Sequence, residues 1–141
     1  MSNAEDKSWH RYRDAVSAST ELMQRKENEQ ALRLLDGAIA MAIAENENRW
    51  VLTLSHHAAI IAGFLEDWPR VKNYYEQSLD LNPENPAALS GLADVAKVQG
   101  ELEAAREYAA RCYKVLTEGD EFLKDAWLET LLKKWPEVAQ R

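Results

Sequence analysis

The chain has 141 residues, of which 46% are hydrophobic, so it has the length and apolar content of one globular domain. Its formal net charge of -7 repels phosphate backbones and anionic lipid headgroups, which argues against nucleic acid and membrane surfaces as partners and favours basic peptides. The single cysteine, Cys112, excludes an internal disulfide. No apolar stretch has the length of a membrane span, and the N-terminus lacks the apolar core of a signal peptide. We therefore expect a cytoplasmic protein.

Residues 1–7 are predicted to be a disordered N-terminal segment. The run Ser2-Asn3-Ala4 matches a vector-derived tag scar, while Met1 in front of it leaves a native start open. The first helix is expected from about Ser8, with apolar and small residues at helical spacing. After a break on charged residues at 26–29, a second helix completes a first hairpin at about residues 8–46.

The second hairpin is expected at about residues 50–83. Its first helix, roughly 50–65, ends in a run that is apolar nearly all round, which indicates burial on several sides. Its second helix begins after Asp67, because an Asp followed closely by a proline is typical of a helix start, and ends before Pro83. Trp50 is predicted to cover the seam between the first two hairpins.

The third hairpin is expected at about residues 85–117. Asn85 and Pro86 form a strong helix start, because Asn accepts hydrogen bonds from free amides and proline presets φ. The chain turns at Gly100, and the facing positions of the two helices are small enough for close backbone approach: Ala93, Ala96, Ala105, Ala109 and Cys112. A last amphipathic helix, about 120–135, is predicted to cap the stack, and residues 137–141 form a tail.

An internal repeat relates the three hairpins. Ala31 lies 40 residues before Val71, and Val71 lies 34 residues before Ala105, with the same two steps at several other core positions. A period of 34 residues is that of the tetratricopeptide unit. The six extra residues of the first step fall within 43–52, which predicts that the second helix is extended by more than a turn.

With this period, small residues at Ala93, Ala105 and Cys112, and a turn glycine at Gly100, the chain resembles the tetratricopeptide-repeat family over about residues 8–135. The resemblance implies an all-α domain at 8–136, built as a right-handed superhelical stack of about three helix-turn-helix hairpins plus a C-terminal capping helix. It also implies a non-catalytic protein–protein interaction module that binds a peptide or protein segment in its concave groove.

In such a stack, the first helix of each hairpin lines the groove. The side chains predicted to point into the groove lie on these leading helices, away from the partner helix, with one more on the capping helix: Arg13, Val16, Thr20, Met23, His56, Ile60, Phe64, Ser90, Asp94, Lys97, Val98 and Lys124. Five of these residues are apolar and are predicted to form the floor of the groove: Val16, Met23, Ile60, Phe64 and Val98. The competing interpretation is that Ile60, Phe64 and Val98 are core residues.

One ligand known for the family is not expected here. Some members hold the C-terminal carboxylate of chaperone peptides with a clamp of lysine, asparagine and arginine side chains. The matching positions of this chain lack a suitable pair of donors: Val16, Thr20, His57, Ala87 and Gly91.

No enzyme, metal site or cofactor is predicted. His56 and His57 are adjacent, so on a helix they point about 100° apart and do not readily share a metal. The sequence has no glycine-rich phosphate loop, zinc-ligand spacing or nucleophile motif.

Two other protein-binding functions stay open. The chain is also similar to small acidic secretion-type chaperones of the same family, which suggests a self-associating adaptor that pairs through Trp9 and Trp135 at the two ends of the stack. The competing interpretation is that each tryptophan folds back onto a neighbouring helix. A structural role at the end of a larger complex, with binding through the convex face, is the other alternative. Whether the protein is a monomer or a homodimer, and which partner it binds, is left open by the sequence.

Overall fold

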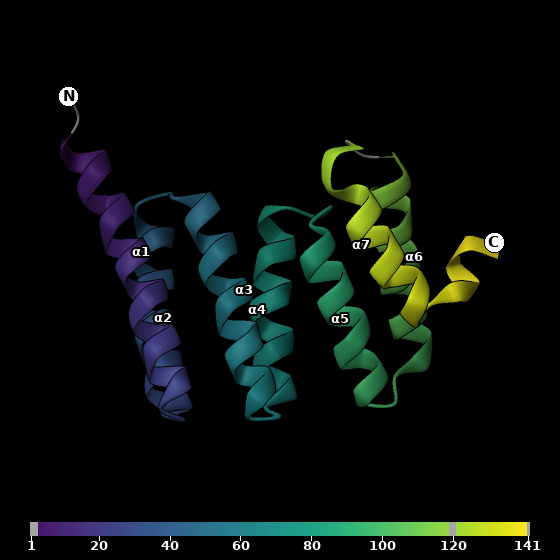
Figure 1. Ribbon diagram of the computed structural model, residues 1–141, viewed down its shortest axis with the longest axis horizontal. Coiled ribbons are helices and arrows are strands. Elements are labelled where there is room, and N and C mark those ends of the chain that lie inside the picture. Colours follow the sequence, from purple (N-terminus) through teal and green to yellow (C-terminus); the bar gives the residue numbers. More distant parts are fainter. Residues whose placement is uncertain (1–2, 119–120, 141) are drawn as a thin grey trace. The chain divides into compact units, whose positions relative to one another are not determined.

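The computed structural model describes residues 3–118 and 121–140. Within these ranges the chain forms helices and no strand (Figure 1). The elements in chain order are α1 (Asn3–Gln24), α2 (Asn28–Ala44), α3 (Asn48–Phe64), α4 (Trp68–Leu81), α5 (Pro86–Val98), α6 (Leu102–Glu118), α7 (Glu121–Lys134) and the short 3-10 helix η1 (Pro136–Gln140). The predicted all-α stack of helical hairpins is confirmed.

The helices form two compact units, Met1–Tyr74 and Tyr75–Arg141, with the boundary inside α4. In the first unit α2 packs against both α1 and α3, and α1 also contacts α3. In the second unit α5 packs against α6, while α7 and η1 pack against α6 (Figure 1). Successive helices therefore pair as neighbours within each unit, as hairpins require.

The first helix starts earlier than the sequence suggested. α1 begins at Asn3, ahead of the predicted start near Ser8, so it takes in most of the segment predicted to be disordered. The other helices begin and end within two residues of the predicted hairpin limits.

The six extra residues of the first repeat step are divided between two helices. α2 has 17 residues against 14 in α4, and α3 has 17 against 13 in α5, while the connection between α2 and α3 is one residue shorter than that between α4 and α5. The prediction that α2 is extended by more than a turn was wrong, because α2 is only three residues longer than α4. α2 ends at Ala44 because Asn46, with φ of 57°, turns the chain immediately afterwards.

Four of the helices, α1, α2, α3 and α5, end with the same backbone turn. Each is followed by one residue with positive φ: Lys26, Asn46, Glu66 and Gly100. The next amide then donates to a carbonyl five residues back, as Glu101 N–H does to Ala96 at 2.8 Å. This is the Schellman arrangement, which satisfies carbonyls that a helix end leaves free. Gly100 adopts it without strain, whereas Lys26 and Glu66 carry a Cβ that disfavours it.

Polar contacts tie the second hairpin to the first within the first unit. Arg70, at the start of α4, donates to Glu29 of α2 at 2.6 Å and to Asp67 at 2.6 Å. The Tyr74 hydroxyl donates to Asp36 of α2 at 2.6 Å. The hydrogen bond from Arg70 holds the pKa of the Asp67 carboxyl below its usual range.

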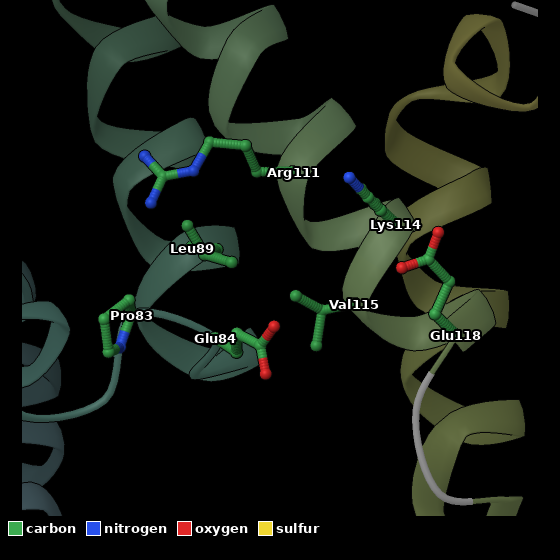
Figure 2. A pocket seen from close by; sticks show the side chains of 7 residues that line it. All are labelled: Pro83, Glu84, Leu89, Arg111, Lys114, Val115 and Glu118. Carbon is green, nitrogen blue, oxygen red and sulfur yellow. The ribbon is translucent and has the colours of Figure 1, made fainter.

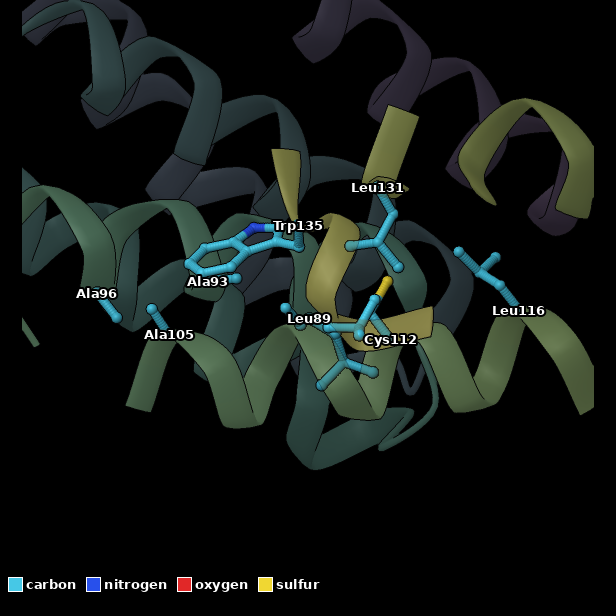
Figure 3. Close-up of a cluster of buried hydrophobic side chains, with 10 residues drawn as sticks. Leu89, Ala93, Ala96, Ala105, Cys112, Leu116, Leu131 and Trp135 are labelled. Atoms are coloured by element: carbon cyan, nitrogen blue, oxygen red, sulfur yellow. The ribbon is translucent and has the colours of Figure 1, made fainter. Parts of the chain in front are cut away.

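The predicted close contact between α5 and α6 is confirmed in the second unit. Its buried cluster consists of Leu89, Ala93, Ala96, Ala105, Ala109, Cys112, Leu116, Leu131, Trp135 and Val138. Figure 3 shows Leu131 and Trp135, from the C-terminal part of the chain, among the side chains of α5 and α6. Burial raises the pKa of the Cys112 thiol to about 11, so this cysteine is an inert core residue.

Candidate functional site

The leading helices α1 and α3 lie against each other in the first unit, and a polar contact marks where they meet. Thr20 Oγ1 lies 3.1 Å from His57 Nε2, and the same hydroxyl donates to the Val16 carbonyl at 2.9 Å. Thr20 was predicted to face the groove, whereas His57 was not. His57 lies beside Thr20 because α1 packs on α3, and the sequence of a single helix does not reveal how two helices pack.

An aromatic group joins the same two helices at their other end. The ring of Trp50 on α3 lies 5.5 Å from that of Tyr12 and 6.3 Å from that of Trp9, both on α1. Trp50 therefore covers the seam between the first two hairpins, as predicted. Arg13 is exposed and stacks its guanidinium 4.8 Å from the Trp9 ring, so this predicted groove residue belongs to the aromatic end of α1.

Two large apolar side chains stand exposed on α3. Ile60 is 41% exposed and Phe64 is 65% exposed. They are four residues apart, so they lie on one face of the helix. Val16 and Met23 on α1 are half-buried, as is His56 on α3. The interpretation of Ile60 and Phe64 as core residues was wrong, because their side chains meet solvent.

Burial favours the neutral form of the two histidines of α3, because it lowers their pKa values. Burial lowers the pKa of His56, and burial together with the neighbouring His56 lowers the pKa of His57. A neutral imidazole hydrogen-bonded to a threonine does not supply the cationic donor that a ligand carboxylate needs. The chemistry of α1 and α3 thus favours an apolar ligand over an anionic one.

The predicted groove residues of α5 belong to the second unit, and two of them contact the C-terminal region. Asp94 Oδ2 accepts a hydrogen bond from Lys134 Nζ at 3.0 Å. The Lys97 ammonium lies 5.1 Å from the centre of the Trp135 ring. Ser90 is half-buried and Val98 is exposed, so Val98 is not a core residue. The side chain of Lys124, the remaining predicted residue, lies outside the described residues.

The two terminal tryptophans behave differently. Trp135 is 5% exposed and packs into the buried cluster of α5 and α6, so it folds back onto neighbouring helices. Trp9 is 48% exposed despite its contact with Trp50. The proposal of two exposed aromatic ends was therefore wrong for Trp135.

Gly91, one of the positions that match the carboxylate clamp, is filled by the protein itself. A Cβ added to Gly91 would overlap the ring of Tyr75, which is itself buried. Both residues belong to the second unit. The glycine is thus required by packing, and this position has no space for a ligand.

A hollow that the sequence did not predict lies on the α6 side of the second unit. It has a volume of about 390 Å³ and is lined by Pro83, Glu84, Leu89, Arg111, Lys114, Val115 and Glu118. Figure 2 shows that the α6 side chains come from successive turns of that helix. Such helical spacing was the available signal, but charged residues so spaced usually form a solvated surface. None of the predicted groove residues lines this hollow.

The described residues contain no group of three or more His, Cys, Asp or Glu side chains placed to hold a metal ion. In the same part of the chain, none of the helices is both long enough and apolar enough to cross a membrane.

Comparison with known proteins identifies the repeat. The family model described as Tetratricopeptide repeat matches residues 65–111. The photosystem I assembly protein Ycf3 of Rippkaea orientalis is 33% identical over 96 residues, which are 68% of this chain and 50% of that protein. The chain thus spans about half the length of this curated relative.

Two solved structures share the fold. The C-terminal tetratricopeptide-repeat domain of an FK506-binding protein from Plasmodium falciparum superposes with a TM-score of 0.66 and 15% identity, covering 98% of this chain and 97% of that one. The type III secretion translocator chaperone SycD of Yersinia enterocolitica, in a form described as an alternative dimer, superposes with a TM-score of 0.62 and 16% identity, covering 89% and 96%. At these identities the likeness concerns the fold.

Proposed function

Because the chain is a tetratricopeptide-repeat protein, we propose that it is a non-catalytic, cytoplasmic adaptor that binds a peptide or protein segment through its leading helices. The observation that carries the proposal is the exposure of Ile60 and Phe64 on one face of α3. In a soluble protein, neighbouring large apolar side chains left in water mark a binding surface. The tetratricopeptide fold itself implies a protein-interaction or adaptor role.

The proposed ligand is a short helix or extended segment with apolar anchors. Covering an Ile or Phe side chain completely contributes roughly 1.5–3 kcal/mol, so two anchors are enough for specific but reversible binding. The net charge of -7 favours basic residues flanking those anchors. A rigid helical pair adds preorganisation, because the ligand alone then loses conformational freedom on binding.

A second candidate function is a small acidic chaperone that keeps a partner protein competent for assembly or export. Its support is the description of two similar proteins, one as a photosystem I assembly protein and the other as a secretion translocator chaperone. The same apolar surface of α3 would serve this function. What distinguishes the two is the state of the partner, which a chaperone binds before assembly and an adaptor binds in the finished complex.

The test is affinity capture from a lysate of the source cell with three forms of the chain. The wild type is compared with an Ile60→Glu, Phe64→Glu variant and with a control variant, Ile43→Glu, Leu81→Glu, which changes similarly exposed apolar residues on α2 and α4. The proposal expects partners that are captured by the wild type and the control but lost with the α3 variant. Partners retained by a folded α3 variant would show that another surface binds them.

A further inference from the structure

The hollow on the α6 side of the second unit combines an apolar floor with charged walls. Leu89 is fully buried and Val115 is half-buried, so these two side chains form the floor. The walls carry a basic pair and an acidic pair, all exposed: Arg111 and Lys114, and Glu84 and Glu118. A volume of about 390 Å³ is in the range of small-molecule sites, so the hollow is large enough to take a small ligand.

The two pairs lie at different ends of the hollow. Along α6, Arg111 and Lys114 precede Glu118, which is the last residue of the helix. With a rise of about 1.5 Å per residue, the basic pair lies roughly 6–10 Å from Glu118 along the helix axis. In Figure 2, Leu89 lies between the Arg111 guanidinium and the Glu84 carboxylate. The hollow thus has a basic end and an acidic end, with the apolar floor between them.

The protein does not neutralise these charges itself. Within the part of the chain that the structure describes, none of the four charged groups forms an ion pair. Lys114 precedes Glu118 by four residues, which is the less favourable order for a helical ion pair. Arg111 stacks its guanidinium 5.7 Å from the Tyr108 ring, and stacking leaves the in-plane N–H donors to a ligand. An acidic residue at the C-terminal end of α6 also opposes the helix dipole, so helix stability does not account for Glu118.

The turn that carries Glu84 is held in place by hydrogen bonds. The Glu84 amide donates to Asn82 Oδ1 at 3.2 Å, and the Asn85 amide donates to the Asn82 carbonyl at 3.0 Å. Asn85 in turn caps α5, because its Oδ1 accepts a hydrogen bond from the Ala87 amide at 3.0 Å. Pro83 further restricts the turn through its fixed φ. The backbone of the acidic end is therefore ordered before a ligand binds, which lowers the entropy cost of binding.

A short free peptide with apolar side chains has the complementary order of groups. We propose that the hollow binds a zwitterionic peptide of two or three residues, with its C-terminal carboxylate at the basic pair and its N-terminal ammonium at the acidic pair. An extended residue spans about 3.3–3.6 Å, so the two termini are roughly 7–10 Å apart, which matches the separation of the two ends of the hollow. The apolar side chains of the peptide cover Leu89 and Val115.

This site goes beyond the proposed protein-binding face of α3. All the residues that line it belong to the second unit, whereas Ile60 and Phe64 belong to the first. Among the described residues that line the hollow, none matches a position of the family's carboxylate clamp. A zwitterion has no net charge, so the net charge of -7 on the chain does not repel it.

Titration of the protein with the dipeptide leucyl-leucine, followed by the methyl NMR signals of Leu89 and Val115, tests the proposal. Three blocked forms of the dipeptide are matched controls: the C-terminal amide lacks the carboxylate, the N-acetyl form lacks the ammonium, and the doubly blocked form lacks both. We expect each block to raise the dissociation constant about 10-fold or more, because each removes a hydrogen bond between charged groups.

Two double variants assign each terminus of the peptide to its end of the hollow. The Arg111→Gln, Lys114→Gln variant should bind leucyl-leucine and its amide equally, because the carboxylate has lost its partners. The Glu84→Gln, Glu118→Gln variant should likewise no longer distinguish the free from the acetylated N-terminus. All four residues are exposed, so the fold is kept. The control variant Arg106→Gln, Glu107→Gln changes exposed charges of α6 outside the hollow and should keep both preferences.

The outcomes separate this site from the proposed face of α3. A chain that does not bind leucyl-leucine at millimolar concentration overturns the inference. Equal binding of the doubly blocked dipeptide overturns it too, and would assign the hollow to an internal segment of a protein. The Ile60→Glu, Phe64→Glu variant should bind the dipeptide like the wild type, whether or not it has lost captured protein partners.

Discussion

The two ends of the repeat differ in whether the chain covers the outer face of the last hairpin there. At the C-terminal end α7 and η1 cover the last hairpin and bury Leu131, Trp135 and Val138. At the N-terminal end the first hairpin exposes a groove of small residues, and Trp9 is half in water. The same kind of hairpin is therefore closed at one end by the chain itself and left available at the other. A repeat protein can use one end for stability and the other for association.

The largest expected effect separates the two terminal tryptophans. Trp135→Ala removes a buried ring from the core of the second unit, and we expect it to lower the free energy of unfolding by about 3–5 kcal/mol. Trp9→Ala, at a half-exposed ring, should cost less than about 1.5 kcal/mol, since much of its surface is already in water. Urea denaturation of both variants measures the difference. Equal losses would contradict the distinction between a closed and an open end.

Two glycine substitutions test the same difference between the closed and the open end of the repeat. Gly91→Ala puts a methyl group into the ring of Tyr75, so we expect a loss of about 1–3 kcal/mol in the free energy of unfolding. Gly37→Ala, in the open groove of the first hairpin, meets no atom within 4 Å and should stabilise the protein by about 0.5–1 kcal/mol, because alanine is the better helix former. Thermal unfolding of both variants shows whether each substitution lowers or raises the stability of the protein. A destabilising Gly37→Ala would show that the groove is filled in the folded monomer.

The turns that close α3 and α5 give a smaller, opposed pair of effects. Gly100, at φ of 80°, follows α5 in the second unit, and Gly100→Ala should cost about 1 kcal/mol, because an L side chain disfavours this backbone conformation. Glu66 follows α3 in the first unit at φ of 54°, and Glu66→Gly should recover up to about 1 kcal/mol. Equal and opposite shifts of the urea midpoint would confirm that one backbone turn serves both units.

The smallest effect is a pH dependence confined to the first unit. The pKa values of His56 and His57 are lowered in the folded chain from an ordinary value of 6.5. The unfolded chain therefore binds more protons once the pH falls below about 6.5, so stability is complete above that pH and declines as the pH falls toward the folded pKa values. Denaturation between pH 7.5 and about 5.5 should show this decline, and a His56→Asn, His57→Gln variant should remove it. An unchanged slope in the variant would assign the decline to other groups.

Helical periodicity was enough to predict the hairpins, because a core face repeats along each helix. The close packing at Ala93, Ala105 and Cys112 could also be predicted, because small side chains at facing positions let two helices approach closely. The partners of Asp94 and Lys97 could not be predicted, since they depend on how the end of α7 meets α5, some 40 residues away in the sequence. Gly91 is a similar case: its sequence neighbours say nothing of the Tyr75 ring that rests on it.

The predicted groove residues include apolar side chains for which the sequence left two interpretations open, groove and core. Ile60, Phe64 and Val98 are apolar residues that the structure exposes, and sequence patterns cannot tell such residues from core. The insertion in the first repeat step was located correctly, but its division between α2 and α3 depends on where the positive φ of Asn46 closes the helix. The sequence did not predict the open groove beside Gly37. Small residues indicate that a helix can pack closely there, but they do not show whether the chain itself supplies that helix.

The central claim is that the exposed face of α3 binds a protein segment, and hydrogen–deuterium exchange on the chain with a captured partner tests it most directly. The account predicts slowed exchange in α3 around Ile60 and Phe64 and in the neighbouring part of α1, with α6 unchanged. Protection confined to α6, around the hollow lined by Arg111 and Lys114, would contradict it and place binding on the second unit.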